Sequence, residues 1–204
     1  MRKEIRVKKQ AWLASILVVA VLLIDQIIKM AVKTSMYIHE SIRITDWFYI
    51  YFTENKGMAF GMELFDKFFL TSFRIIMVIV ISVYLFRIIR RGINTGYVVC
   101  CALVLAGAAG NIIDCMFYGL IFNSPPPPIP AEFVSFGAGY ETAFHGRVVD
   151  MFYFPIIDTH WPSWLPWVGG ERFIFFSPVF NFADAAISCG MISILLFYRA
   201  HLPK

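Results

Sequence analysis

Charged residues are scarce in this sequence of 204 residues. Asp, Glu, Lys and Arg make up 16% of it, whereas hydrophobic residues make up 59% and the mean hydropathy is +0.68. A soluble domain typically has about 25% charged residues, so this chain has too few polar side chains to cover a water-soluble globule. The composition indicates an integral membrane protein. In such a chain the net charge of +4 is interpreted by position and does not point to nucleic acid.

Motifs for metals and disulfides are also lacking. The four cysteines (Cys100, Cys101, Cys115 and Cys189) lie in apolar stretches and form no Cys-x-x-Cys pair. We interpret them as small hydrophobic side chains. The four histidines are scattered and no His-Glu-x-x-His motif occurs, which argues against a membrane metalloprotease. We therefore expect no metal and no other cofactor.

Four apolar segments have the roughly 20 residues that a membrane-spanning helix needs, at about 11–32, 68–89, 97–120 and 181–198. Basic residues precede the first, as in a signal peptide, but its apolar pattern continues to Val32, so we interpret it as a retained helix. Ten of the 18 Lys and Arg lie in the N-terminus, the 87–96 connection and the C-terminal tail. Because basic residues stay inside, we expect cytoplasmic termini and a single domain, 1–204, with outer segments 33–67 and 121–180.

The outer segments have patterns of their own. Residues 41–53 are rich in β-branched and aromatic residues, which predicts a hairpin or small sheet. Five prolines between 123 and 139 predict an extended stretch. Trp161, Trp164 and Trp167 are typical of an aromatic anchor at the outer membrane boundary. The predicted fold class is a membrane protein, mainly α, with four transmembrane helices and a small extracytoplasmic β-element.

Five ionisable residues lie within the predicted spans: Asp25, Lys29, Arg74, Asp114 and Asp184. Each costs about 2.5–3.5 kcal/mol at the centre of a membrane helix. With the orientation given above, all five fall at one depth near the outer leaflet. We interpret Asp25 and Lys29, four residues apart on one helix face, as a structural ion pair.

The acidic residues suggest chemistry. Asn111 and Asp114 share one helix face, as do Asn181 and Asp184. Asp150 follows just outside the membrane, where it can meet Asp184. Two nearby carboxylates share a proton, and such a pair can hydrolyse a peptide bond. From the residues alone a structural role, a proton-coupled transporter and an inactive scaffold stay open, although charges confined to one leaflet disfavour a transport path.

Five blocks together resemble the bacterial lipoprotein signal peptidase (signal peptidase II) family. They are Asp25-Gln26-x-x-Lys29, Asn55-x-Gly57-x-Ala59-Phe60, Gly110-Asn111-x-x-Asp114, Gly146-x-Val148-Val149-Asp150 and Phe180-Asn181-x-Ala183-Asp184. The resemblance implies a membrane aspartic endopeptidase of the bacterial inner membrane. It removes the signal peptide of diacylglyceryl-modified prolipoproteins, cutting before the lipidated cysteine, and is inhibited by the cyclic peptide globomycin.

The resemblance also implies roles for single residues. Asp150 and Asp184 match the catalytic pair, with the active site near the outer leaflet. Asp25 and Lys29 would brace the site. The residues expected to bind substrate or support the pair are Asn55, Gly110, Asn111, Asp114, Asn181 and Arg147.

Two features depart from the family. Cys115 stands where the family usually has Arg, so that Arg74 or Arg147 is left to supply a guanidinium. The 121–145 stretch is longer than the usual connection, and a passive loop and a gate both remain open for it.

Overall fold

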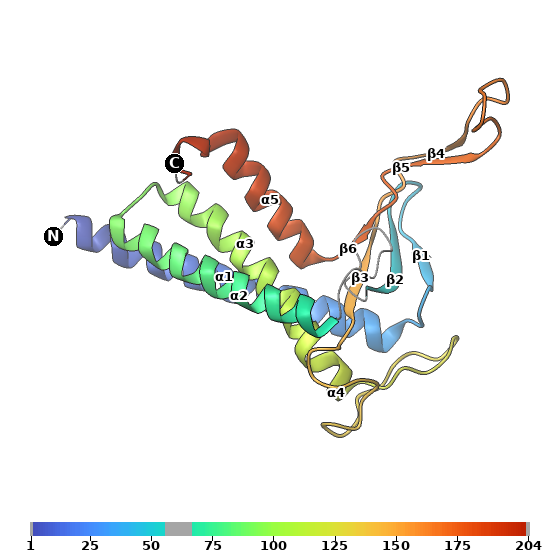
Figure 1. The fold of residues 1–204 in the computed structure, drawn as a ribbon, viewed down its shortest axis with the longest axis horizontal. Helices are drawn as coiled ribbons and strands as arrows, with labels where there is room; N and C mark the ends of the chain where they lie inside the picture. Colours follow the sequence, from blue (N-terminus) through green and yellow to red (C-terminus); the bar gives the residue numbers. More distant parts are fainter. Residues whose placement is uncertain (1, 56–66, 203–204) are drawn as a thin grey trace.

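The computed structural model describes residues 2–55 and 67–202 (Figure 1). Three of its described helices are long and apolar enough to cross a membrane, and α5 is a shorter apolar helix of 16 residues. The predicted class, four apolar helices with a small sheet, is confirmed, although the first helix begins nine residues earlier than expected. The helical elements are α1 (Arg2–Ser35), α2 (Lys67–Arg91), α3 (Thr95–Ile113), a π-helical turn (Asp114–Tyr118), α4 (Gly119–Ile121), α5 (Phe182–Phe197) and a 3₁₀ turn (Arg199–His201).

Asparagine side chains cap the N-termini of two of the helices. Asn94 caps α3 by accepting hydrogen bonds from the backbone N–H groups of Gly96 and Tyr97. Asn181 and Asp184 form a reciprocal capping box at the start of α5. Such caps satisfy N–H groups that have no partner inside the helix. The second cap also places Asp184 in the first turn of α5.

Small residues let α3 and α5 approach closely. A Cβ atom on Gly107 would lie 2.2 Å from the backbone oxygen of Ala183, which is far inside van der Waals contact. Gly107 therefore lies directly at the contact between the two helices. Close packing of this kind is a main source of association between helices in a membrane.

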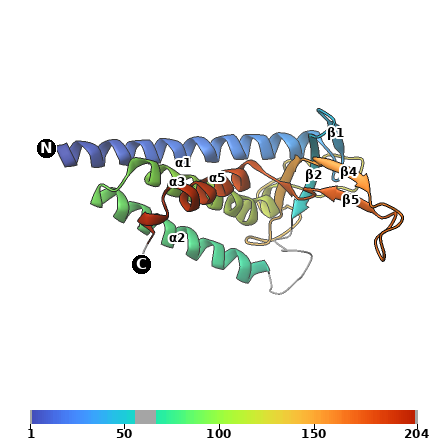
Figure 2. The same ribbon diagram turned by 90° about the horizontal axis from the view of Figure 1, so that it is seen from above.

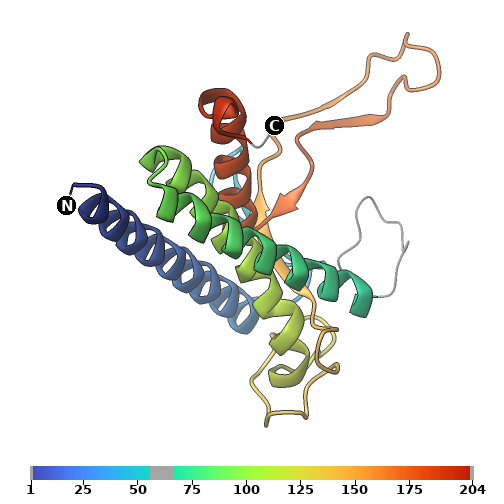
Figure 3. The same cartoon turned by 60° about the vertical axis from the view of Figure 1, so that its left-hand side comes forward.

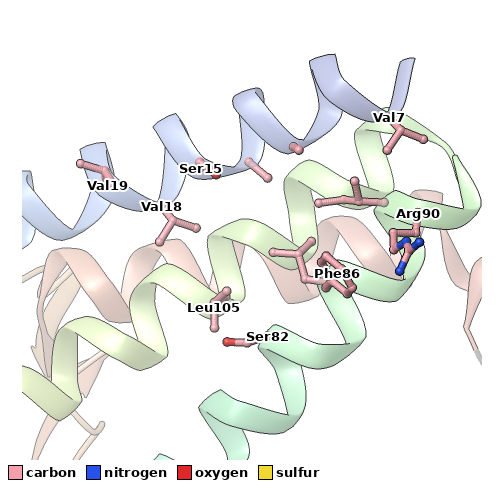
Figure 4. A pocket seen from close by; sticks show the side chains of 12 residues that line it. Val7, Ser15, Val18, Val19, Ser82, Phe86, Arg90 and Leu105 are labelled. Carbon is pink, nitrogen blue, oxygen red and sulfur yellow. The ribbon is translucent and has the colours of Figure 1, made fainter. Parts of the chain in front are cut away.

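The helices α1, α2 and α3 pack less closely and leave a cavity between them. An apolar cavity of about 430 Å³ lies between α1, α2 and α3, and Figure 4 shows Val7, Val18, Phe86 and Leu105 among the side chains around it. Its lining residues on α1 fall between Val7 and Val19, in the half of that helix that Figures 1 and 2 show farther from the sheet. None of the predicted site residues lines it.

A four-stranded antiparallel sheet stands at the opposite end of the bundle from both termini (Figure 1). Its strand order is β1-β2-β3-β6, and a separate hairpin pairs β4 with β5. The hairpin predicted over 41–53 is present as β1 and β2, but its pairing with the strand that carries Asp150 was not predicted. The strands are β1 (Ser41–Arg43), β2 (Tyr49–Asn55), β3 (Val148–Tyr153), β4 (Ile157–His160), β5 (Arg172–Phe175) and β6 (Val179–Phe180).

The proline-containing stretch after α4 is bonded back onto the protein. The N–H groups of Glu141 and Val134 donate to the backbone oxygens of Gly119 and Ile121, both at 2.9 Å. Ala131 N–H donates to the oxygen of Lys33 at 3.3 Å. The segment is extended, as expected, and these hydrogen bonds fasten it to the protein at several points, although most of residues 124–139 are exposed.

We predict that Gly107→Leu separates α3 from α5, because the added side chain meets backbone rather than a movable side chain. Overpacking of this kind lowers the free energy of unfolding by roughly 1–3 kcal/mol. Thermal unfolding in detergent measures the effect. Cys189→Leu, on an exposed position of α5, is the matched control, and equal melting temperatures for the two variants would contradict the prediction.

Candidate active site

A buried ion cluster joins α1 to α3. The Lys29 ammonium lies 2.9 Å from Asp25 Oδ2 and 2.8 Å from Asp114 Oδ2. All three side chains are shielded from solvent. Asp25 in turn accepts a hydrogen bond from the N–H of Ala183 at 2.9 Å, which ties the start of α5 to α1. The predicted bracing pair, Asp25 and Lys29, is thus joined by Asp114 and holds three helices together.

Asn111 connects this cluster to Asp184. Lys29 donates to Asn111 Oδ1 at 2.9 Å, and Asn111 Nδ2 donates to Asp184 Oδ1 at 2.8 Å. The ammonium fixes which end of the amide faces it, because only the oxygen can accept. The amide N–H₂ therefore donates to the Asp184 carboxyl group.

Asn181 connects Asp150 to the same network. Its Nδ2 donates to Asp150 Oδ1 at 2.7 Å and to Asn111 Oδ1 at 3.1 Å, while its Oδ1 accepts from the N–H of Asp184 at 2.9 Å. One buried amide thereby holds the strand residue Asp150 and the helix residue Asp184 in fixed relation.

Asp114 makes further contacts inside the buried ion cluster. Besides Lys29 it accepts from Gln26 Nε2 at 2.9 Å and from the N–H of Val149 at 3.4 Å. Val149 precedes Asp150, so this contact helps to place β3. Asp114, which was expected to bind substrate or support the pair, is fully buried.

Two glycines allow the elements to meet here. A Cβ on Gly110 would lie 2.8 Å from Asp25 Oδ2, and one on Gly146 would lie 2.2 Å from the backbone oxygen of Asp114. Gly146 N–H also donates to the oxygen of Cys115 at 2.9 Å. The chain therefore enters β3 while pressed against the π-helical end of α3. Gly110, predicted as a substrate or support residue, makes room for the ion cluster.

Burial dominates the protonation of Asp150, which is only 3% exposed. Loss of solvent and then the charge of Asp184 raise its pKa to about 7, against hydrogen bonds from Asn181 and Asn55 that lower it. Asn55 is the last residue of β2 and lies at the predicted place beside the carboxylates. Gly57, Ala59 and Phe60, from the same predicted block, lie outside the described residues.

A second buried ion cluster was not predicted. Glu54 pairs with Lys33 and, at 3.0 Å, with Arg147. The Lys33 ammonium also lies 5.2–5.9 Å from the ring centres of Phe52, Phe122 and Tyr140. Burial alone would raise the pKa of Glu54, but the two cations outweigh it and hold the pKa below its ordinary value.

This cluster and Gln26 are what sequence reasoning missed. Lys33 continues the 25–29–33 face of α1, and Glu54 adjoins Asn55; both signals were available. Arg147, expected to bind substrate or support the pair, is paired with Glu54 and stacks over Tyr140 at 4.8 Å. Arg74 reaches Cys115, with 3.4 Å between Nη1 and Sγ.

These features define a class of protein. Two aspartates from different elements are brought together at one end of a bundle of membrane-length helices, where one amide hydrogen-bonds toward both. Paired carboxylates in a poorly solvated site are the apparatus of aspartic peptidases. The fold and the site define a membrane aspartic peptidase.

Comparisons with known proteins identify the family. A family model described as signal peptidase (SPase) II matches residues 17–199. The lipoprotein signal peptidase of Porphyromonas gingivalis is 50% identical over 190 residues, covering 93% of this chain and 84% of the relative. That of Amoebophilus asiaticus is 33% identical over 203 residues, covering 96% and 81%. The chain belongs to the signal peptidase II family.

The fold agrees with this assignment. A solved structure described as a bacterial membrane enzyme, at 1.9 Å resolution, superposes with a TM-score of 0.58 and 25% identity. The match covers 90% of this chain and 90% of that one. The similarity therefore extends over the helices and the sheet together.

We predict that Glu54→Gln destabilises the protein, because it leaves the buried Lys33 and the half-buried Arg147 without their shared counter-charge. Removing one member of a buried pair costs on the order of 3–5 kcal/mol. Thermal unfolding measures this, with Asp46→Asn, in an exposed pair with Arg43, as the control. A Glu54→Gln variant as stable as Asp46→Asn would contradict the prediction.

The same cluster predicts a pH dependence. The folded-state pKa of Glu54 lies below its ordinary value, so its contribution is present above the unfolded pKa, near 4.5, and is lost as the pH falls through the folded pKa. Wild type should lose stability relative to Glu54→Gln below about pH 4.5. Melting temperatures of both between pH 3 and 7 test this, and parallel curves would contradict it.

Proposed function

We propose that this signal peptidase II family member uses Asp150 and Asp184 to remove the signal peptide from diacylglyceryl-modified prolipoproteins, cutting before the lipidated cysteine. The observation that carries the assignment is the Asn181 amide, which donates to Asp150 and accepts from the N–H of Asp184. Family membership supplies the substrate class.

The two aspartates have different environments and hence different roles. Asp150 is buried and its pKa is raised to about 7, so it holds a proton near neutrality. Asp184 is more exposed and accepts a hydrogen bond from Asn111. Asp184 therefore takes a proton from the attacking water, while Asp150 donates a hydrogen bond to the scissile carbonyl oxygen.

The remaining predicted residues hold this pair. Asn111 and Asn181 orient the carboxylates, while Asp25, Lys29, Asp114 and Gly110 support them from the helices. Asn55 hydrogen-bonds Asp150 from the end of β2. It is exposed, so it has free surface for a peptide backbone to contact.

We place the protein in the bacterial inner membrane with both termini cytoplasmic and the site near the outer leaflet. Both termini lie at the end of the bundle away from the sheet (Figure 1). That end carries Arg90 and Arg91 in the last turn of α2 and the basic start of α1, and basic residues stay inside.

Diacylglycerol holds the substrate at the depth of the pair, and each buried CH₂ contributes about 0.8 kcal/mol. Globomycin, a cyclic peptide, is proposed to bind against the same two aspartates, as the family assignment implies. A proton-coupled transporter gains no support, because the described intramembrane charges gather at one end of the bundle.

We predict that Asp150→Asn and Asp184→Asn each abolish cleavage of a diacylated prolipoprotein peptide, followed by mass spectrometry. Each removes a group that must exchange a proton, and the double variant should be no worse than either single one. Near-normal turnover by either variant would disprove the assignment. Asp158→Asn, in an exposed ion pair with Arg172, is the control and should cleave normally.

The Asp150 proton also affects stability. Its pKa is raised from 3.8 to about 7, so its contribution is fully present below the unfolded pKa and is lost as the pH rises through about 7. Wild type should lose thermal stability from pH 5 to 8 more than Asp150→Asn does. Identical pH dependence of the two melting temperatures would contradict this.

We predict that the same peptide without its lipid is cut negligibly, because nothing then holds the scissile bond at the depth of the pair. The ratio of kcat/KM for the two peptides measures the effect. The control is a lipidated peptide with a scrambled signal sequence, and comparable kcat/KM with and without lipid would overturn the proposed recognition.

A further inference from the structure

The β4–β5 hairpin is set apart from the rest of the described protein. It leaves the main sheet between β3 and β6 and forms a sheet of its own, with His160 opposite Arg172 at its far end. All four residues of β4 are exposed. The connection between Asp150 and Asp184 therefore carries an extension that the network of the active site does not use.

The tip of the hairpin displays tryptophan. Trp164 is 77% exposed and Trp167 is 98% exposed, whereas Trp161 packs on the Phe173 ring with 4.6 Å between centroids. Trp167 has a backbone φ of 71°, which is rare and costly for a bulky side chain. The fold thus maintains a strained backbone that holds an indole outward.

Two further features of the tip favour its transfer from water into the membrane interface. No charged residue occurs between His160 and Glu171. Its backbone is bonded internally: Gly170 N–H donates to the oxygen of Trp161, and Gly169 N–H to that of Leu165, both at 3.0 Å. A segment with satisfied backbone groups and no charge enters the edge of a bilayer at low cost.

The direction of the hairpin indicates its partner. Figures 1 and 3 show it leaving the sheet sideways, across the helices rather than along them. Because the helices cross the membrane, an element that runs across them from their outer end stays near the membrane surface. Tryptophan is the residue enriched at that level, since its ring is apolar and its N–H is polar.

We propose that the β4–β5 hairpin lies in the headgroup region of the bilayer, with the indoles of Trp164 and Trp167 inserted. This lipid contact fixes the sheet that carries Asp150 at the depth of a lipidated substrate. The inference rests on the proposed function for its placement at the outer membrane face.

Fluorescence of the full-length protein in phosphatidylcholine nanodiscs tests the contact without any cleavage assay. In a background with Trp12→Phe, Trp47→Phe and Trp161→Phe, only the two tip indoles emit. Lipids brominated near the headgroup should quench this emission by about half, and acrylamide should quench it weakly. Strong acrylamide quenching with no effect of bromolipid would overturn the proposal. The proposal would also be overturned if the tip indoles were protected from both quenchers and two copies of the protein could be crosslinked, because the tip would then contact protein rather than lipid.

Activity provides the second measurement. Trp164→Ser with Trp167→Ser removes two exposed side chains and should leave the melting temperature unchanged. Cleavage of lipidated peptide in vesicles should fall about threefold or more, cleavage in detergent should not change, and replacing both by Tyr should restore the vesicle rate. An unchanged cleavage rate in vesicles, or an equal loss of the cleavage rate in detergent, would refute the proposed lipid contact. If wild type cleaved nothing, the proposed function would fail while the quenching result stood.

Discussion

The structure depends on one buried ammonium group. Lys29 contacts Asp25, Asp114 and Asn111 at 2.8–2.9 Å, and the side chains of Lys29, Asp25 and Asp114 are shielded from water. A lone charge there would carry a large desolvation cost, so the helices that supply its partners must assemble together. Since Asp25 also accepts from the start of α5, closing this cluster fixes α1, α3 and α5 in one arrangement.

The alignment of the two aspartates follows from that arrangement and from a second constraint. Asp184 is set by the helices, through Asn111 and the capping box. Asp150 is set by the sheet, whose β2 strand is anchored through Glu54 to Lys33 on α1. Helix and strand are thus tied to the same face of α1. Their meeting at Asn181 is a property of the tertiary fold.

Much of this was predictable from the sequence. Asp25 and Lys29 are one helical turn apart, and the two Asn–Asp pairs have the same three-residue spacing, so local geometry placed them correctly. Partners that meet only across the fold could not be read in this way: Arg147 and Glu54 are 93 residues apart. For the same reason spacing could not show that Asp114 is buried against Lys29 and Gln26.

Cys115 illustrates how a charge can be supplied from another element. The family usually has Arg at this position, directly after the carboxylate that holds Lys29. Here the Cys115 thiol is buried and the guanidinium of Arg74, from α2, lies against it at 3.4 Å. A cation therefore still reaches this end of α3, though from a helix that supplies no other member of the cluster. The position of α2 therefore affects the electrostatics of the site. It does so although, among the described contacts, no side chain of α2 touches Asp150 or Asp184.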